Sequence, residues 1–264
     1  MPYLIHTDIS NLSFEILRNK NLGLSPQDRV INLLINTLQT DEIWFPAFNY
    51  DFAMTKVFNP KKDKIQVGSI NQHVMKMSNS IRTFTPMFSF IGLGKLLSPL
   101  KKKYYEPFSF DSEMGELLKT DSEVIFLGTS IKSFTFIHFI EEQEHLGYRY
   151  QKKMYGKIQL ENESYETVLD WKVRPSKRYL GYDWGKISNE LLSKNILRNY
   201  TPFGQNSYIM KLSNFYEVIK EKINNDPYYL LDSQTRKWVE PAIQNLQRPF
   251  QISDFENGLN DLIN

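Results

Sequence analysis

The stretch that decides the fold runs Val124-Ile-Phe-Leu-Gly128-Thr129 and continues, after five residues, as Thr135-Phe-Ile-His138-Phe-Ile-Glu141. The first part is a short apolar run that ends at a glycine, which is typical of a buried strand followed by a turn. The second part spaces threonine, histidine and glutamate three residues apart, so that on a helix they share one face. The sequence therefore predicts a strand, a turn, and a helix whose first turn presents His138.

The pair His138 and Glu141 is the candidate catalytic site. A carboxylate beside an imidazole fixes the tautomer and orientation of the ring and stabilises its protonated form, which is what a general base requires. Two other interpretations remain open. The histidine could form a surface pair with a glutamate, and Glu142 competes with Glu141 for the orienting role, although the three-residue spacing favours Glu141.

Composition limits the classes of function. The chain has 264 residues, 41% of them hydrophobic and 14% aromatic, which is enough for a substantial core in one large or two small domains. A net charge of +2 gives no support for nucleic acid as the main partner. The absence of cysteine excludes disulfides, zinc-thiolate sites and a cysteine nucleophile. Four histidines, none in an HExxH or His-x-His pattern, lead us to expect no metal site.

Targeting signals are not evident. The N-terminus has no basic segment followed by an apolar core, and no run approaches the roughly 18 apolar residues that span a bilayer. We therefore expect a cytoplasmic protein.

Other segments complete an α/β pattern. Residues 3–6 and 42–46 read as strands, and between them Ser25-Pro26 is a typical helix start, with serine as the N-cap and proline in the first turn. Residues 157–173 predict a hairpin that turns near 162–164. A strand alternating with a helix in this way favours an α/β core.

The remaining segments are less regular. Apolar spacing predicts a helix over 187–196, residues 208–212 read as a strand, and Asn214 with Glu217 has the spacing of a capping box that opens a last helix. Residues 49–111 show little periodicity. Neither a repeat nor a clean linker is visible, so we expect one domain.

A longer series of motifs carries a resemblance to a known family. In chain order the series is His6-Thr7-Asp8, Phe45-Pro46-Ala-Phe48-Asn49-Tyr50, Gly68, Arg82-Thr-Phe-Thr-Pro86-Met-Phe-Ser89, Pro107-Phe108 with Ser112 and Gly115, Leu127-Gly128, Thr135-x-x-His138-x-x-Glu141, Tyr148-Arg149 and Phe203-Gly204. This order and spacing resemble the aminoglycoside 3-N-acetyltransferase family of acyl-CoA-dependent N-acyltransferases. The family shows a strand ending His-Ser-Ser, an Arg-Ser-x-His-Pro-x-x-Ser segment, and Thr-x-x-His-x-x-Glu followed by Tyr-Arg.

The resemblance implies a fold and a reaction. The fold would be α/β, with a mixed sheet flanked by helices, and residues 1–232 would form the acyl-CoA N-acyltransferase domain with 233–264 as a C-terminal extension packed on or beside it. Acetyl-CoA or another short acyl-CoA would serve as co-substrate, and no metal is expected. The imidazole matching His138 would take a proton from the attacking amine, and the carboxylate matching Glu141 would orient that imidazole.

The resemblance also implies binding residues. It assigns CoA binding to His6, Thr7, Asp8, Arg82, Thr83 and Ser89, and substrate binding to Asn49, Tyr50 and Thr85. Several structural alternatives stay open: His6 and Asp8 could belong to a turn, Arg82 could be a structural ion-pair partner, and Tyr148-Arg149 could brace the His138 helix. The lysine run at 101–103 could hold a CoA phosphate or be a solvated surface.

Departures from the family pattern fall near the expected cleft. Thr85 stands where the family has histidine, and Thr83 and Thr7-Asp8 replace serines. A polycationic aminoglycoside needs an acidic pocket, whereas this segment has few carboxylates and lysine clusters stand at 61–64 and 101–103. We therefore expect the acceptor to be an amino sugar, nucleotide-linked and destined for surface polysaccharide.

Three alternatives to this function remain. The first is a true aminoglycoside 3-N-acetyltransferase. The second is a non-catalytic CoA-binding or interaction protein, with aromatics at 107–110 and 228–229 as an interface. The third and weakest is a hydrolase using Ser89 or Ser112, because no Gly-x-Ser-x-Gly elbow is present. Homo-oligomers are possible in each case.

Overall fold

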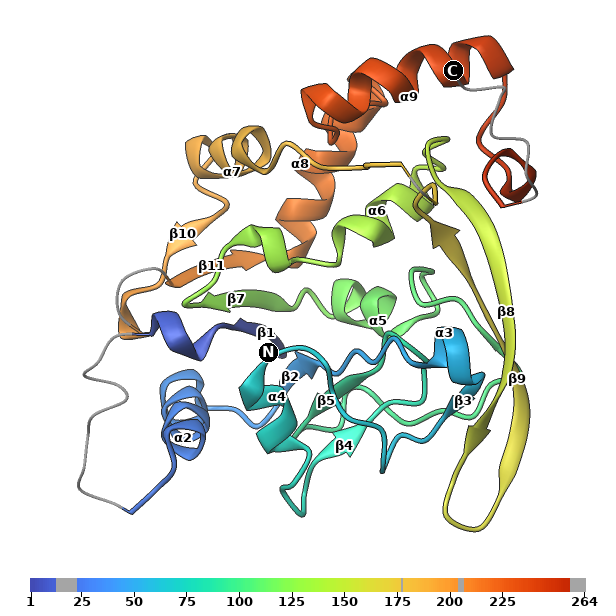
Figure 1. Cartoon of the computed structure of the whole chain (residues 1–264). Coiled ribbons are helices and arrows are strands. Elements are labelled where there is room, and N and C mark those ends of the chain that lie inside the picture. Colours follow the sequence, from blue (N-terminus) through green and yellow to red (C-terminus); the bar gives the residue numbers. More distant parts are fainter. Residues whose placement is uncertain (13–22, 177, 204–206, 257–264) are drawn as a thin grey trace.

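A computed structural model describes residues 1–12, 23–176, 178–203 and 207–256. Its centre is a seven-stranded mixed sheet with the strand order β10-β11-β7-β1-β2-β5-β4 (Figure 1). Strand β1 (Tyr3–Thr7) runs parallel to both β7 (Glu123–Leu127) and β2 (Ile43–Pro46), while β11 (Ser207–Lys211) pairs antiparallel with β7. The predicted α/β class is confirmed, with helices on both faces of a mixed sheet.

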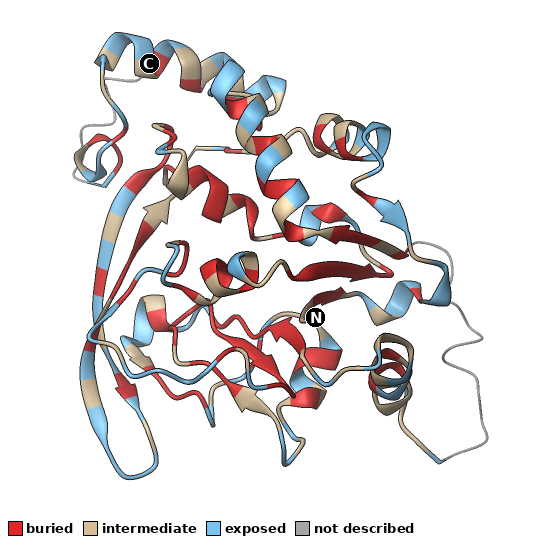
Figure 2. Cartoon of the chain, turned by 180° about the vertical axis from the view of Figure 1, so that it is seen from behind, coloured by how far each residue is buried: buried red, intermediate tan, exposed pale blue. Residues whose placement is uncertain are grey.

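The central strand β7 shows why the sheet is buried on both faces. All five of its residues are buried, and alternate side chains enter separate cores. Val124 and Phe126 join one hydrophobic cluster, whereas Ile125 and Leu127 join the other. A strand that is buried on both faces has a continuous apolar run in its sequence, and residues 124–127 show this pattern. Figure 2 shows the central strands of the sheet in the colour of buried residues.

Helices cover the two faces unequally. On one face lie α2 (Pro26–Leu38) and α4 (Ser69–Val74). The other face is covered by α5 (Glu113–Lys119), α6 (Ile137–Gln143), α7 (Trp184–Ser193) and α8 (Leu212–Asn225). The start of α2 is as predicted: Ser25 caps it in a capping box with Asp28, and Pro26 is its first residue.

A second, four-stranded sheet stands beside the first, in the order β3-β8-β9-β6. Its main part is the hairpin of β8 (Tyr150–Gln159) and β9 (Ser164–Val173), which forms the curved wall of the molecule in Figure 1. The predicted turn position is confirmed, and the first strand begins seven residues earlier than the 157 that we expected. Its alternating burial places every other side chain in solvent, so the hairpin presents one face to the core.

The segment 49–111, which shows no periodicity, consists of very short elements. They are α3 (Phe52–Thr55), β3 (Val57–Phe58), α4, β4 (Ile81–Arg82), β5 (Phe90–Gly92) and β6 (Tyr104–Tyr105). Elements of two to six residues are too short to show a helical or strand period. Strand pairing with β2, β8 and β9 holds them in place.

The remaining short elements connect the larger ones. They are the 3₁₀ turns η1 (Ile9–Asn11), η2 (Ile131–Ser133), η3 (Thr201–Phe203) and η4 (Ile252–Asp254), and the strand β10 (Arg198–Asn199). Gly204, which closes the motif series, lies outside the described residues.

Two expectations about the C-terminal part were wrong in detail. The helix α8 begins at Leu212 and has no side-chain cap, so Asn214 and Glu217 do not form a capping box. The polar tail contains a further helix, α9 (Ser233–Leu246), which Asp232 caps and which contains Pro241. Val239 joins the main hydrophobic cluster. The described part of the expected extension therefore packs into the same core.

A glycine joins the exits of the two parallel strands. Gly128, which follows β7, has a φ of 62°, and a Cβ there would lie 2.4 Å from the carbonyl oxygen of Asp8. The backbone amide of Asp8 donates to the Leu127 carbonyl (2.8 Å), and the side-chain amide of Asn11 donates to the Gly128 carbonyl (3.1 Å). Only glycine combines this backbone conformation with so close an approach.

We expect Gly128→Ala to lower the free energy of unfolding by at least about 1–2 kcal/mol, because alanine is strained in the left-handed region and would collide with the Asp8 carbonyl. Gly185→Ala in the first turn of α7 is the matched control, since a Cβ there meets only Asp183 at 3.5 Å. Urea unfolding of both variants measures the difference. Equal stability of the two variants would contradict this account of the turn.

Candidate active site

His138 is the second residue of α6, and its ring is held from one side. Its Nδ1 lies 2.8 Å from Oε2 of Glu141. A carboxylate can only accept a hydrogen bond, so Nδ1 carries the proton and Nε2 keeps a free lone pair. The Glu141 side chain is 1% exposed, whereas that of His138 is 25% exposed. The predicted neighbours thus lie side by side, with the carboxylate behind the ring and the ring facing outward.

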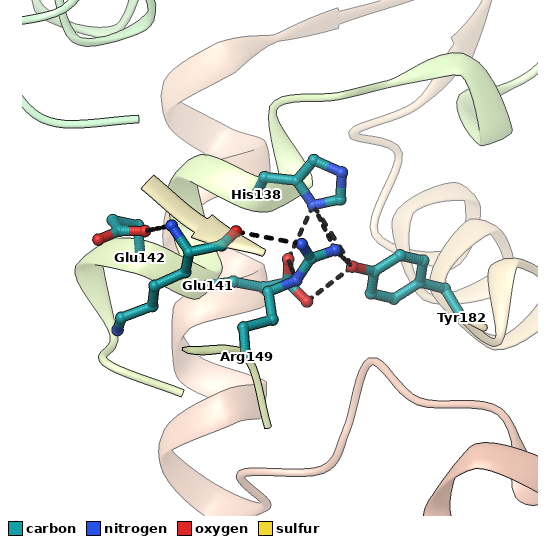
Figure 3. Close-up of polar contacts among 6 residues, drawn as sticks. His138, Glu141, Glu142, Arg149 and Tyr182 are labelled. Atoms are coloured by element: carbon teal, nitrogen blue, oxygen red, sulfur yellow. Dashed lines mark hydrogen bonds and ion pairs between the residues drawn. The ribbon is translucent and has the colours of Figure 1, made fainter. Parts of the chain in front are cut away.

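Two further side chains fix the carboxylate (Figure 3). Arg149 places Nε 2.7 Å from Oε2 of Glu141, and the Tyr182 hydroxyl donates to Oε1 at 2.7 Å. Arg149 also donates to the Tyr182 hydroxyl at 2.5 Å. Its Nη2 lies 3.1 Å from Nδ1 of His138, but two donors cannot bond each other, so Arg149 acts on the imidazole through Glu141 and through its charge.

The pKa values follow from this packing. Burial alone would raise the pKa of Glu141, but the Arg149 charge and the bond to His138 bring it down to about 2. Burial lowers the pKa of His138, the Arg149 charge lowers it further, and Glu141 partly opposes both. The imidazole is therefore neutral near neutral pH and able to accept a proton at Nε2.

Glu142, the competitor for the orienting role, points elsewhere. Its Oε2 accepts a hydrogen bond from the Lys172 backbone amide on β9 at 3.1 Å. Figure 3 shows its side chain on the far side of the cluster from His138. The helix geometry separates two adjacent carboxylates, as the three-residue spacing predicts.

His138 opens into a cavity of about 510 Å³, here called the His138 cavity. Its walls are mostly aromatic or apolar, with two arginines. The lining residues are Tyr50, Met87, Phe88, Phe108, Thr135, His138, Arg149, Trp171, Val173, Arg174, Leu180 and Tyr182. Phe108, which we expected in an exposed interface, is buried in this wall and meets the His138 ring at 5.6 Å.

A second cavity of about 290 Å³, the β1 cavity, lies at the exit of β1. Its lining residues are His6, Thr7, Pro46, Phe48, Tyr50, Val67, Gly68, Asn71, Ser133 and Thr135. Tyr50 and Thr135 line both cavities. The two cavities are therefore neighbours that share these two side chains as walls, close to the start of the His138 helix.

Two polar groups in the β1 cavity have no partner among the described residues. They are Nε2 of His6 and Oγ1 of Thr7, both buried. The His6 ring stacks on Phe126 at 5.4 Å, and burial lowers its pKa to about 3, so the ring is neutral. Buried polar groups without partners are costly. Asp8 instead caps η1 by accepting from the Ser10 amide at 3.1 Å.

Besides Asp8, three more residues expected to bind CoA lie outside both cavities. Arg82 is buried and donates to the carbonyls of Ala47 (2.8 Å) and Asp63 (2.6 Å) and to Ser89 (3.1 Å). Ser89 itself donates to Ala47, and Thr83 accepts from the amide at position 90. These side chains are committed to partners within the protein, so the segment holds the loop that carries the cavity wall.

The residues expected to bind substrate also separate. Of Asn49, Tyr50 and Thr85, only Tyr50 lines the two cavities. The Asn49 amide donates to the Lys64 carbonyl at 2.8 Å. Thr85 donates to Glu113 at 2.7 Å and lines a third cavity. Backbone pairing turns this segment so that Met87 and Phe88, and not Thr85, face His138.

The serines of the hydrolase alternative are placed unfavourably. Ser89 is fully buried, and Ser112 caps α5 by accepting from the Gly115 amide at 3.2 Å. Neither lines the His138 cavity. The lysine run 101–103 likewise lies along the hairpin, where Lys101 pairs with Glu163.

Sequence reasoning missed several residues of the site. Tyr182, Arg174 and Trp171 carry no local motif, and Tyr182 stands 41 residues from Glu141. Only Tyr148-Arg149 had a signal, through its place in the motif series. Among the described residues no cluster of metal-ligating side chains occurs, and none of their helices is long and apolar enough to cross a membrane.

We expect Arg149→Gln to raise the pKa of His138, because the variant removes a positive charge beside the imidazole and leaves the negative charge of Glu141 uncompensated. Arg149→Lys, which keeps the positive charge, should shift the pKa of His138 less. NMR titration of the His138 imidazole in both variants measures the two shifts. An unchanged or lower pKa in Arg149→Gln would contradict the electrostatic role of Arg149.

Residues 32–224 match the family described as aminoglycoside 3-N-acetyltransferase. A comparison with curated protein sequences finds no match.

Several solved structures share the fold. A structure described as AAC-IIIb in a binary complex with CoASH aligns with a TM-score of 0.68 and 13% identity, over 85% of this chain and 90% of the other. Aminoglycoside acetyltransferase AAC(3)-Xa gives 0.67 and 15%, covering 87% of each chain. The YokD protein from Bacillus subtilis gives 0.63 and 15%, over 86% of this chain and 88% of the other. The sequence match spans well over half of the 264 residues, and the chain therefore belongs to the aminoglycoside 3-N-acetyltransferase family.

Proposed function

We propose that this N-acetyltransferase moves an acetyl group from acetyl-CoA to a primary amine of an amino sugar, with His138 as general base. One observation carries the proposal. The imidazole has its Nδ1 proton fixed by a buried, ionised carboxylate and its Nε2 free toward a cavity. That arrangement suits proton removal from an amine at neutral pH.

The proposed reaction is a single displacement through a tetrahedral intermediate. As the amine nitrogen attacks the thioester carbon, Nε2 of His138 takes the amine proton and the C–N bond forms. The intermediate then collapses, the C–S bond breaks, and the imidazolium returns the proton to the sulfur as free thiol. Glu141 stabilises the transient imidazolium, and Arg149 and Tyr182 hold Glu141 in place.

The β1 cavity is the proposed entry for acetyl-CoA. Its unpartnered His6 and Thr7 polar atoms suit the amide groups of a pantetheine arm. The thioester would then lie where the two cavities meet, at Tyr50 and Thr135, within the reach of an amine held beside His138. The structural neighbour described as a complex with CoASH supports this choice of donor.

The contacts around His138 support the reaction, but they say less about which class of amino sugar is the acceptor. The comparisons give no support to the nucleotide-linked sugar for polysaccharide synthesis that the sequence led us to expect. The family's description and the titles of its structural neighbours favour an aminoglycoside-type amino sugar. An acceptor of this broader type is therefore the one to test first.

We expect His138→Ala to lower the turnover number by roughly 10²–10⁴-fold, the usual contribution of a general base. Free-thiol release from acetyl-CoA, assayed against a panel of amino sugars that includes aminoglycosides, measures the effect. His73→Ala on α4 is the matched control, because that histidine pairs with Asp28 away from both cavities. Near-normal turnover in His138→Ala would reject the mechanism.

We expect Thr7→Val to raise the KM for acetyl-CoA about fivefold with little change in the turnover number. The substitution keeps the shape of the side chain and removes one hydroxyl, whose hydrogen bond contributes about 1 kcal/mol. Thr120→Val at the end of α5, which lines neither cavity, is the control. If both variants keep the wild-type KM, the β1 cavity does not contact the donor through Thr7.

A further inference from the structure

One positive charge in the His138 cavity is uncommitted. Arg174 directly follows β9, is exposed, and lines the cavity. Within the part of the chain that the structure describes, no hydrogen bond or ion pair is found for its guanidinium. The other arginine of the cavity, Arg149, is buried and paired with Glu141 at 2.7 Å. Arg174 is thus free to bind a ligand, and Arg149 is not.

No negative charge balances Arg174 within the cavity. None of the described lining residues is aspartate or glutamate. The carboxylate beneath His138 belongs to Glu141, which is 1% exposed and already bonded to His138, Arg149 and Tyr182. A ligand with several ammonium groups needs complementary carboxylates, and this cavity supplies a cation in their place.

The charge of Arg174 acts on His138, beside which the amine would react. It helps to lower the pKa of His138, although burial, Arg149 and Glu141 have larger effects on that pKa. Phe108 and Trp171, both buried, form apolar walls of the same cavity. Apolar surroundings strengthen electrostatic attraction and repulsion alike. A group bound at Arg174 would therefore lie in the same cavity as an amine beside the imidazole.

We propose that Arg174 binds an anionic group, a phosphate or a carboxylate, on the acceptor, so that the enzyme selects amino sugars with a negative substituent over polycationic ones. The planar guanidinium suits both groups, because it can donate two parallel hydrogen bonds to their oxygens. This inference rests on the proposed acetyl transfer to an amino sugar, and within that class it favours an anionic acceptor over the polycationic aminoglycosides that the family's description suggests.

The phosphates of acetyl-CoA are a second possible partner of Arg174, but the positions of the two cavities do not favour them. In the proposed arrangement the pantetheine arm occupies the β1 cavity, which shares only Tyr50 and Thr135 with the described lining of the His138 cavity. The CoA phosphates lie at the far end of that arm from the thioester. Arg174 lines the His138 cavity and not the β1 cavity, so it stands in the space left for the acceptor.

The test compares two matched acceptors, glucosamine and glucosamine 6-phosphate, with gentamicin as the polycation. Thiol release is followed for the wild type, Arg174→Gln and Arg174→Glu. We expect the wild type to have a kcat/KM about 10- to 100-fold higher for the phosphorylated sugar, as a charge-assisted pair provides. Arg174→Gln should abolish the preference, and Arg174→Glu should reverse it and favour gentamicin. The KM for acetyl-CoA should stay unchanged.

Arg198→Gln is the matched control, since Arg198 is an exposed arginine of β10 that lines neither cavity. If both Arg174 variants raise the KM for acetyl-CoA and lose activity equally with each sugar, the anion belongs to CoA and the acceptor proposal is overturned. An unchanged preference in Arg174→Glu overturns it as well.

Failure of the proposed function is distinguishable from failure of this inference. If the wild type releases no thiol with any amine, acetyl transfer to these sugars is rejected. Calorimetric binding of glucosamine 6-phosphate to the wild type and to Arg174→Glu then decides the role of Arg174. Binding that Arg174→Glu weakens about tenfold or more supports the anion site, and equal binding or none to the wild type rejects it.

Discussion

The buried carboxylate of Glu141 is the constraint on which the site depends. A charge in this position is tolerated only because Arg149 and Tyr182 pair with both of its oxygens. Each partner comes from a different part of the chain: His138 and Glu141 from α6, Arg149 from the residue before β8, and Tyr182 from the segment before α7. The carboxylate therefore joins three segments as well as orienting the imidazole.

The two sheets explain where this cluster stands. The large sheet carries β1 and β7 side by side in parallel, so their exits meet at one edge, where Gly128 and Asp8 connect. Helix α6 follows β7 and places His138 above that edge. The β8–β9 hairpin then forms the opposite wall and contributes Trp171 and, just past its end, Arg174. The cavity thus lies between α6 and the hairpin, and its two arginines, Arg149 and Arg174, stand directly before β8 and directly after β9.

Local patterns predicted the parts of this protein that are governed by local physics. The apolar run 124–127, the Ser25-Pro26 cap and the turn of the hairpin each follow from residues close together in the chain, and the structure has them where expected. The contact between His138 and Glu141 is also local, since one helical turn brings them together. The short elements within 49–111 were not predicted, because a strand of two residues is too short to show a period. The helix α9 was not predicted either, because its polar residues and Pro241 obscure the helical pattern.

The sequence by itself determined the fold class, the family and the pairing of His138 with Glu141. Tertiary structure alone decided which polar residues line the cavities. The side chains of Arg82, Thr83 and Ser89 form hydrogen bonds that hold a loop. Thr85 donates to Glu113. Tyr182 and Arg174 line the His138 cavity although they lie far from His138 in the sequence. The physical reason is that a hydrogen-bonding side chain acts on whatever the packed backbone places beside it. That neighbour depends on contacts far apart in the chain, which no local spacing records.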